Sequence, residues 1–168
     1  LSNNLIDLEF NIEKTKKLFV EKINILGNNV TRENVIRNQF LIDEGDLYND
    51  ILAKKTINNI KSLRFFKSVN SEVKKGSDEN SRIININVEE QATGEISAGA
   101  GFGTEGASIM FGVKENNYLG KGLKVSTNLL LNEERVKGIF SITNPNYNNT
   151  DKSVYFSAEA IETDRLSD

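Results

Sequence analysis

The stretch that decides the fold runs Gly94-Glu95-Ile96-Ser97-Ala98-Gly99-Ala100-Gly101-Phe102-Gly103. Apolar residues alternate here with polar or very small ones, and in an extended strand such neighbours point to opposite faces. The same period of two recurs through the rest of residues 93–168, broken by turn residues. The sequence therefore predicts five antiparallel strands, near the roughly 9–11 residues that a strand needs to cross a membrane.

Alternation alone fits either a membrane barrel or a soluble β-sandwich, since both have two unlike faces. One face of the predicted strands is apolar, and the opposite face carries Ser, Asn, Gly, Lys and Glu. The core of a sandwich would need large apolar residues on its inward side. Tyr118 and Tyr147 also fall at turn ends, where aromatic residues of a membrane interface are expected. These features favour the barrel. Because the smallest membrane barrels have about eight strands, we expect a fragment of a longer protein.

The preceding residues, 18–92, predict a small α+β module with the order β-α-α-β-β. Apolar alternation bounded by turn residues marks three strands, the first ending at Gly27-Asn28-Asn29. The expected strands are Phe19–Leu26, Phe66–Lys74 and Arg82–Glu90. An earlier strand over Leu5–Ile12 predicts that residues 1–17 end a preceding module.

Two helices are expected between the first and second strands, packed on one face of the sheet. We expect Thr31 to cap a short helix over Arg32–Phe40 and Asn49 to cap a longer one over Asp50–Leu63. So small a module has a modest core. Replacing Ile60 or Phe66 by alanine should then cost about 2–5 kcal/mol.

Composition removes several kinds of chemistry. The 168 residues include no cysteine and no histidine, so thiol and imidazole nucleophiles, disulfides and Cys/His zinc sites are excluded. The net charge of −3 gives no electrostatic basis for nucleic-acid binding. Carboxylate or lysine chemistry remains open, so composition counts against an enzyme without excluding one. We expect no cofactor and no metal.

Two motifs resemble a dinucleotide-binding site and a calcium-binding loop, but the neighbouring sequence does not support either function. Residues 101–106 fit the dinucleotide pattern G-x-G-x-x-G, which requires a helix to follow, but an alternating strand follows instead. A hairpin turn is the better interpretation. Asp43, Glu44, Asp46 and Asp50 lack the alternating spacing of a calcium loop, so a solvated turn between helices is expected.

Five sequence segments, taken in chain order, resemble the last POTRA module and first barrel strands of the BamA family of outer-membrane assembly proteins. The resemblance covers nearly the whole chain. In the module it rests on FVEKINILGN at residues 19–28 and LRFFKSV at residues 63–69. In the strand region it rests on GAGFGT at residues 99–104, NNYLGKG at residues 116–122 and Thr143-Asn144-Pro145.

The resemblance implies a non-enzymatic protein of the cell outer membrane, with its POTRA module in the periplasm. It would fold and insert other β-barrel proteins. The implied partners are unfolded outer-membrane proteins, accessory lipoproteins of the assembly complex and outer-membrane lipid. In this orientation Gly103–Gly106 and Asn132–Arg135 are outer loops, and Asn117–Gly122 and Asn144–Lys152 are periplasmic turns.

Two candidate sites follow. The first barrel strand would form one side of a lateral opening, kept weakly paired by its glycines, through Glu95, Ser97, Gly99, Gly101 and Gly103. The alternative for these glycines is a crowded position inside the barrel. The second candidate is an edge of the POTRA sheet that captures extended segments by β-augmentation, through Ser68, Val69, Asn70, Ser71, Glu72 and Val73.

Other proteins of the same architecture remain open at this point. A two-partner secretion transporter or an autotransporter-assembly relative would also join POTRA modules to a barrel, and so would a mitochondrial or plastid homologue. A different class, a soluble all-β binding domain attached to an α/β module, would pack Ile96, Ile109 and Phe156 inside a compact core.

Overall fold

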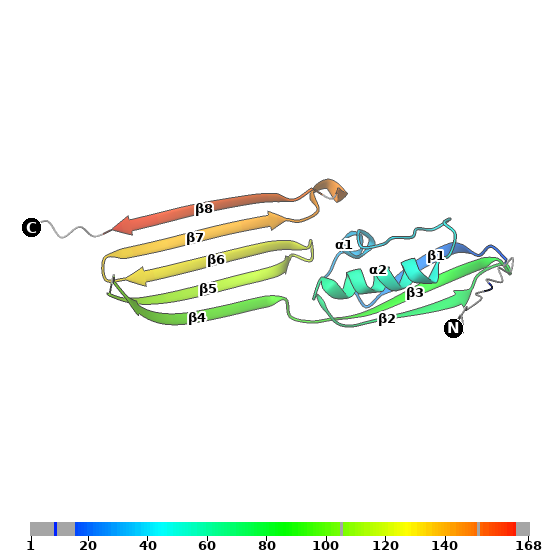
Figure 1. Cartoon of the computed structure of the whole chain (residues 1–168), viewed down its shortest axis with the longest axis horizontal. Helices are drawn as coiled ribbons and strands as arrows, with labels where there is room; N and C mark the ends of the chain where they lie inside the picture. The colour runs from blue at the N-terminus through cyan, green and yellow to red at the C-terminus, as the bar shows by residue number, and fades with distance from the viewer. Residues whose placement is uncertain (1–8, 10–15, 105, 151, 164–168) are drawn as a thin grey trace, which may run out of the picture.

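The computed structural model describes residue 9 and residues 16–104, 106–150 and 152–163 of the chain. These residues form a three-stranded sheet with two helices, followed by a separate five-stranded antiparallel sheet (Figure 1). The predicted class, an α+β module with the order β-α-α-β-β followed by five antiparallel strands, is confirmed. The strand expected at Leu5–Ile12, and with it the end of a preceding module, lies almost entirely outside the described residues.

The N-terminal module, residues 18–92, has its strands in the order β1-β3-β2. Strand β3 is central because β1 pairs with it in parallel and β2 pairs with it as an antiparallel hairpin. The parallel pair requires a crossover connection, which the two helices supply. The elements are β1 (Phe19–Leu26), α1 (Glu33–Arg37), α2 (Asp50–Ser62), β2 (Phe66–Lys75) and β3 (Ser81–Glu90).

Helix α2 begins as predicted. The side chain of Asn49 accepts hydrogen bonds from the backbone N–H groups of Ile51 and Leu52, at 2.9 and 3.2 Å. The cap expected at Thr31 is wrong, because α1 is shorter than predicted and begins after Arg32, with no side-chain cap. The Thr31 side chain is buried and makes a different contact, described below.

Both helices contribute to one hydrophobic core. Ile36 of α1 and Ile60 of α2 are fully buried, and they lie in the same cluster as Ile86 of β3 and Phe66 and Val69 of β2. The burial on which the Ile60 and Phe66 predictions depend is therefore confirmed.

The five strands of the second sheet pair strictly in chain order. Their turns alternate between the end near the module and the far end, as predicted (Figure 1). The pattern GxGxxG lies where β4 ends and β5 begins, so the hairpin interpretation is confirmed. The strands are β4 (Gly94–Gly103), β5 (Gly106–Tyr118), β6 (Leu123–Asn132), β7 (Arg135–Asn144) and β8 (Val154–Thr163).

The strand register separates two unlike faces of this sheet. Lys114, Ser126, Ser141 and Ser157 are neighbours across β5 to β8, and the two middle hydroxyls lie 2.7 Å apart. On the other face, Ile96 and Phe102 are 86% and 88% exposed, so they do not belong to a compact core. Ile109 and Phe156 are exposed as well, which contradicts the soluble sandwich. Among the described residues, no helix is long and apolar enough to span a membrane.

Candidate functional site

The predicted gate strand, β4, is an edge of the five-stranded sheet. It pairs with β5 without interruption from Gly94, opposite Glu115, to Gly103, opposite Gly106. In the described part of the chain its other edge has no partner strand. All of its residues are exposed. The outer edge of β4 is therefore the place where a further strand of the full-length protein would pair.

The glycines predicted to weaken β4 differ in how much space surrounds them. A Cβ atom added at Gly103 would meet nothing within 4 Å, and one at Gly99 would only touch the end of Met110 at 3.9 Å. At Gly101 the nearest atom is the hydroxyl of Ser108, at 3.3 Å. Among the described residues, space is limited at Gly101 and not at Gly99 or Gly103. The weakly paired strand stays a prediction.

A crowded glycine does exist, but on the next strand. A Cβ atom at Gly112 would lie 2.5 Å from the Ser97 hydroxyl and 2.8 Å from the Asn128 side-chain oxygen. Sequence reasoning missed this position, because the alternating pattern does not show which small residue faces two polar side chains across neighbouring strands.

The second candidate edge, β2, is also free on one side. Among the described strands it pairs only with β3, from Phe66 opposite Glu90 to Lys75 opposite Arg82. Val69 is buried in the core, whereas Asn70, Ser71, Glu72 and Val73 are exposed and Ser68 is half-buried, with its hydroxyl 3.2 Å from a Glu89 oxygen. Backbone groups along most of the predicted segment are therefore accessible.

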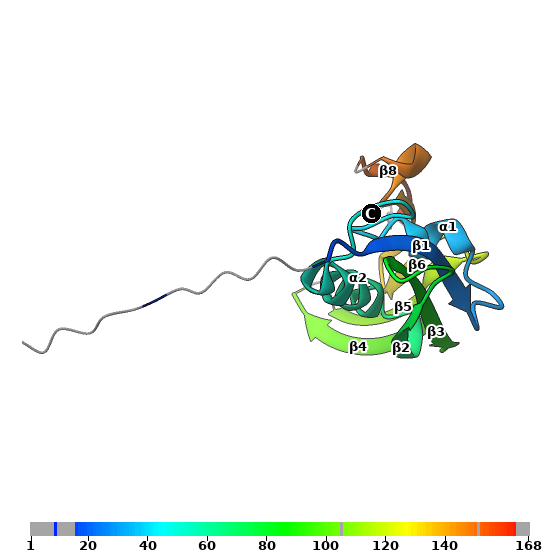
Figure 2. The same ribbon diagram turned by 90° about the vertical axis from the view of Figure 1, so that its right-hand side faces the viewer.

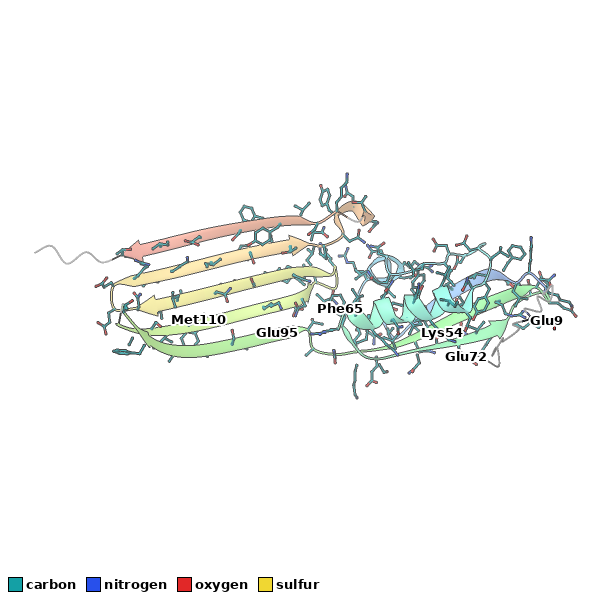
Figure 3. The ribbon with its side chains drawn as sticks, viewed as in Figure 1. Glu9, Lys54, Phe65, Glu72, Glu95 and Met110 are labelled. Atoms are coloured by element: carbon teal, nitrogen blue, oxygen red, sulfur yellow. The ribbon has the colours of Figure 1, made fainter. Side chains whose placement is uncertain are left out.

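The two free edges lie on the same side of the molecule. In Figures 1 and 2, β2 and β4 both form the lower border of their sheets. Figure 3 shows Glu72 on β2 and Glu95 near the start of β4. The chain passes from the first sheet to the second through the short segment between Glu90 and Gly94. Its residue Gln91 donates hydrogen bonds to the carbonyl oxygens of Phe65 and Arg64, at 3.0 and 2.9 Å.

A docking turn, which we define as residues Tyr118–Gly122 between β5 and β6, holds the module against the sheet. The carbonyl oxygen of Gly120 accepts the Arg32 backbone N–H at 2.8 Å. Asn117, at the base of the turn, is buried, and its amide donates to the Thr31 hydroxyl at 2.8 Å. The Asn117 side-chain oxygen accepts the Gly122 N–H at 2.8 Å. The buried Thr31 is therefore part of this joint.

Sequence analysis identified this segment only as a turn. The two glycines and the paired asparagines at residues 116 and 117 mark a tight turn, but they do not reveal its partner 86 residues earlier in the chain. Gly120 has φ +68°, and a Cβ atom there would lie 1.9 Å from the Val30 carbonyl oxygen. Only glycine fits against the module at this point.

The carboxylate of Glu90 completes the joint from the module side. Its oxygens accept the backbone N–H groups of Val30 and Thr31, at 2.8 and 2.6 Å. Burial raises the pKa of Glu90, but hydrogen bonds from the Thr31 hydroxyl and from the backbone of Thr31, Val30 and Asn29 together lower it below its ordinary value. The charged form is therefore the one that holds this loop.

Replacing Glu90 by glutamine should loosen the loop at residues 29–31, because a neutral amide accepts these N–H groups less strongly than a carboxylate does. Amide hydrogen exchange at Val30 and Thr31 should become faster in Glu90→Gln. With the pKa lowered in the folded state, the contribution of Glu90 to stability is present above its ordinary value near 4.5 and is lost as pH falls through the lower folded value. Unchanged exchange in the variant and at low pH would contradict this role.

The acidic cluster between the helices is a hydrogen-bonded turn, as expected. Asp46 accepts the Asp43 N–H at 2.8 Å, Glu44 accepts the Ile23 N–H at 2.9 Å, and Asp50 pairs with Lys54 at 2.6 Å. Among the described residues, no group of three or more acidic side chains is arranged to hold a metal ion.

Comparison with known proteins finds the same two parts. Residues 18–91 match the POTRA family model, described as a surface antigen variable number repeat. The outer membrane protein assembly factor BamA of Nitratidesulfovibrio vulgaris is 29% identical over 167 residues, which are 95% of this chain and 21% of that protein. The chain thus spans about a fifth of the length of this curated relative.

Two solved structures share the fold. BamA from Haemophilus ducreyi lacking POTRA domains 1–3 has a TM-score of 0.82 at 22% identity, covering 90% of this chain and 29% of that one. CdiB from Acinetobacter baumannii has a TM-score of 0.55 at 13% identity, covering 87% of this chain and 28% of the other. The arrangement of module and sheet therefore agrees better with the first structure.

Proposed function

Because this chain belongs to the BamA family, as a POTRA module joined to the first strands of the barrel, we propose that the full-length protein folds and inserts β-barrel proteins into the outer membrane. The strands lie in the outer membrane and the module lies in the periplasm, as in the relatives. The proposed role is non-enzymatic, with unfolded outer-membrane proteins as substrates.

The observation that carries this proposal is that the glycine-rich β4 is the first strand of a sheet with one exposed apolar face. An incoming strand cannot enter lipid with unpaired backbone groups, since each costs several kcal/mol. The edge of β4 would supply temporary partners. Gly99 and Gly103, where an added Cβ atom would have room, support this role, because glycine forms few side-chain contacts that would hold a strand in place.

Locking β4 to the strand that closes the barrel tests this function. The chain has no cysteine, so Ala98→Cys paired with one cysteine in the closing strand of the full-length protein gives a single engineered disulfide in this region. We expect the oxidised protein to lose assembly of outer-membrane proteins and the reduced protein to regain it. Assembly at the normal rate in the locked form would reject the lateral opening.

A matched control locks β4 to the strand with which it already pairs. Ile96 lies directly opposite Val113 on β5, and opposite residues in an antiparallel pair are spaced suitably for a disulfide. The pair Ile96→Cys and Val113→Cys should leave assembly unchanged. Loss of assembly in this control would show that cross-linking itself, rather than closure of the edge, causes the defect.

We also propose that the β2 edge captures extended segments of substrates or accessory lipoproteins. N–H groups of successive strand residues point to opposite edges, so one of Ser71→Pro and Glu72→Pro removes an outward N–H and the other removes one that faces β3. The outward variant should weaken capture of extended peptides while the module keeps its thermal midpoint. If the variant with an unchanged thermal midpoint of unfolding binds extended peptides as tightly as the unmodified protein, the β2 edge does not capture them. Val69 is unsuitable for this test because it is buried.

A transporter of the same architecture, for two-partner secretion or autotransporter assembly, is the second candidate. The structural similarity to CdiB, although weaker than that to BamA, supports this second candidate. The locking experiment separates the two, because a transporter should keep the general assembly of outer-membrane proteins unaffected when its barrel is locked.

A further inference from the structure

The first residues of β4 are held to the end of β5 by side chains as well as by the strand ladder. The Asn116 backbone N–H donates to the Thr93 carbonyl oxygen at 3.2 Å, and the Asn116 side-chain amide donates to the same oxygen at 3.0 Å. The amide also donates to a Glu95 carboxylate oxygen at 3.0 Å. Asn116 therefore contacts the chain on both sides of Gly94, the residue at which β4 begins.

Glu115 adds a second contact to the same segment. One of its carboxylate oxygens accepts the Thr93 hydroxyl and the Asn117 backbone N–H, the latter at 2.7 Å. The other oxygen would lie 3.3 Å from a Cβ atom added at Gly94, so the carboxylate packs against the first residue of the strand. Thr93 and Glu115 are half-buried, as is Asn116, and a hydrogen bond in such a place is stronger than one in open water. We call Glu115 and Asn116 the base anchor of β4.

A local irregularity of β5 explains how neighbouring residues reach different partners. The register of β5 with β6 shifts between Glu115 and Tyr118, and an extra residue in one strand re-aims the side chains around it. Asn116 contacts the start of β4, whereas Asn117 contacts Thr31 of the module. The base anchor thus lies next to the docking turn, at the end of the sheet nearest the module (Figure 1).

The far half of β4, residues 99–103, is held by weaker side-chain contacts in the described part of the chain. The Ser108 hydroxyl donates to the Gly101 carbonyl oxygen at 3.5 Å, which is the limit of a hydrogen bond. Gly99 and Gly103 leave room where a side chain would pack. Glycine also gives the backbone more conformational freedom than any other residue. The two ends of β4 therefore differ in how firmly they are held.

We propose that Glu115 and Asn116 are positioning residues that fix the base of β4, so that movement of this strand is confined to its glycine-rich far half. The inference rests on the proposed function, and it adds a direction to the weak pairing predicted for the strand. An anchored strand returns to the same register after each movement, because its first residues stay with their partners. A strand loose at both ends could re-form one residue out of register, which would exchange the side chains of its two faces.

Hydrogen exchange along β4, measured on the full-length protein in detergent micelles, tests the anchor. We expect exchange, corrected for intrinsic rates, to be slower at residues 94–97 than at residues 100–103. In Thr93→Val combined with Asn116→Ala, exchange at residues 94–97 should rise about tenfold, the size expected for the loss of side-chain hydrogen bonds. Exchange at residues 100–103 should stay the same, so the far half reports whether the variant keeps its fold.

Two single variants sharpen the comparison. Thr93→Val keeps the shape of the side chain and removes only the hydroxyl that Glu115 accepts, so it should raise exchange at the base by a smaller factor. Ser108→Ala removes the long hydrogen bond to Gly101 and should leave residues 94–97 unchanged. Equal exchange along β4 in the unmodified protein would overturn the anchor. So would a rise at both ends in the double variant, or a rise at neither.

Assembly of outer-membrane proteins supplies a readout that depends on where β4 is held. We expect the double variant to assemble more slowly and to recover when a disulfide between Ile96→Cys and Val113→Cys is oxidised, because this link replaces the lost anchor near the base. A disulfide at the far end, between Phe102→Cys and Ala107→Cys, should give no recovery. Recovery with either link would overturn the confinement of movement to the far half. Exchange is measured without assembly, so the anchor can fail while the proposed function stands, and the proposed function can fail while the anchor stands.

Discussion

Replacing Gly120 by alanine is expected to separate the module from the five-stranded sheet. The added Cβ atom would lie 1.9 Å from the Val30 carbonyl oxygen and 2.9 Å from its carbon, and backbone atoms cannot rotate away as a side chain can. The docking turn must then move off the loop, which breaks the Arg32–Gly120 backbone hydrogen bond and the contact between Asn117 and Thr31. Amide hydrogen exchange at Arg32 should rise by about a hundredfold or more, because each lost bond contributes about 1 kcal/mol and the clash adds to that cost.

Gly45 provides a matched control. It also has positive φ, +96°, but a Cβ atom there would meet nothing within 4 Å. Alanine at either position carries the strain of left-handed backbone, which costs about 1–2 kcal/mol. Only Gly120→Ala adds the clash, so exchange at Arg32 should stay slow in Gly45→Ala. Equal exchange at Arg32 in the two variants would show that the docking turn does not hold the module.

The docking turn bears on function because it fixes where the edge of β2 lies relative to the edge of β4. The two edges lie on the same side of the molecule (Figures 1 and 2), so the proposed capture at β2 would hold a segment on the side where β4 lies. If the module moves freely against the sheet, the two edges no longer keep this relative position. Gly120→Ala should therefore slow assembly in the full-length protein even though it changes neither candidate edge.

Local patterns were enough to predict most of the fold. Alternation with a period of two defines β4 to β8 because each strand has one face toward lipid and the other toward water. The Asn49 cap was predictable because its partners are the next residues along the chain. The same holds for the turn at Gly27, which has φ +92°.

Contacts between distant residues were not predictable in the same way. The sequence shows that Thr31 is a good helix cap, but not that Asn117 lies next to it and that the helix begins later. A cavity of about 1240 Å³ between the module and the five-stranded sheet likewise brings Arg32 and Arg64 of the module together with lysines of β5, β6 and the docking turn, although no run of basic residues marks them in the chain. Its existence depends on how the two sheets are joined.

Replacing Ile60 by alanine should destabilise the module by about 2–5 kcal/mol, and replacing Phe66 should cost about 3–5 kcal/mol. Ile60 is 0% exposed and belongs to the core cluster, and Phe66 packs edge-to-face against Phe65 with ring centres 6.4 Å apart. Urea denaturation of residues 18–91 measures the change. Ile51→Ala is the matched control on the same helix, because Ile51 is 65% exposed and its loss should change the free energy of unfolding by less than about 0.5 kcal/mol.

The effect of these core substitutions should exceed what the local contacts suggest, because the module is small. Domains have a total stability of about 5–15 kcal/mol, and one of this size belongs near the lower end. A loss of about 2–5 kcal/mol then leaves a measurable fraction of modules unfolded without denaturant. The loop that carries Thr31 would lose its fixed position in those molecules, and the docking turn would have nothing to bind. Ile60→Ala should therefore also raise hydrogen exchange at Arg32, whereas equal stability of Ile60→Ala and Ile51→Ala would show that the helix α2 face does not form the core.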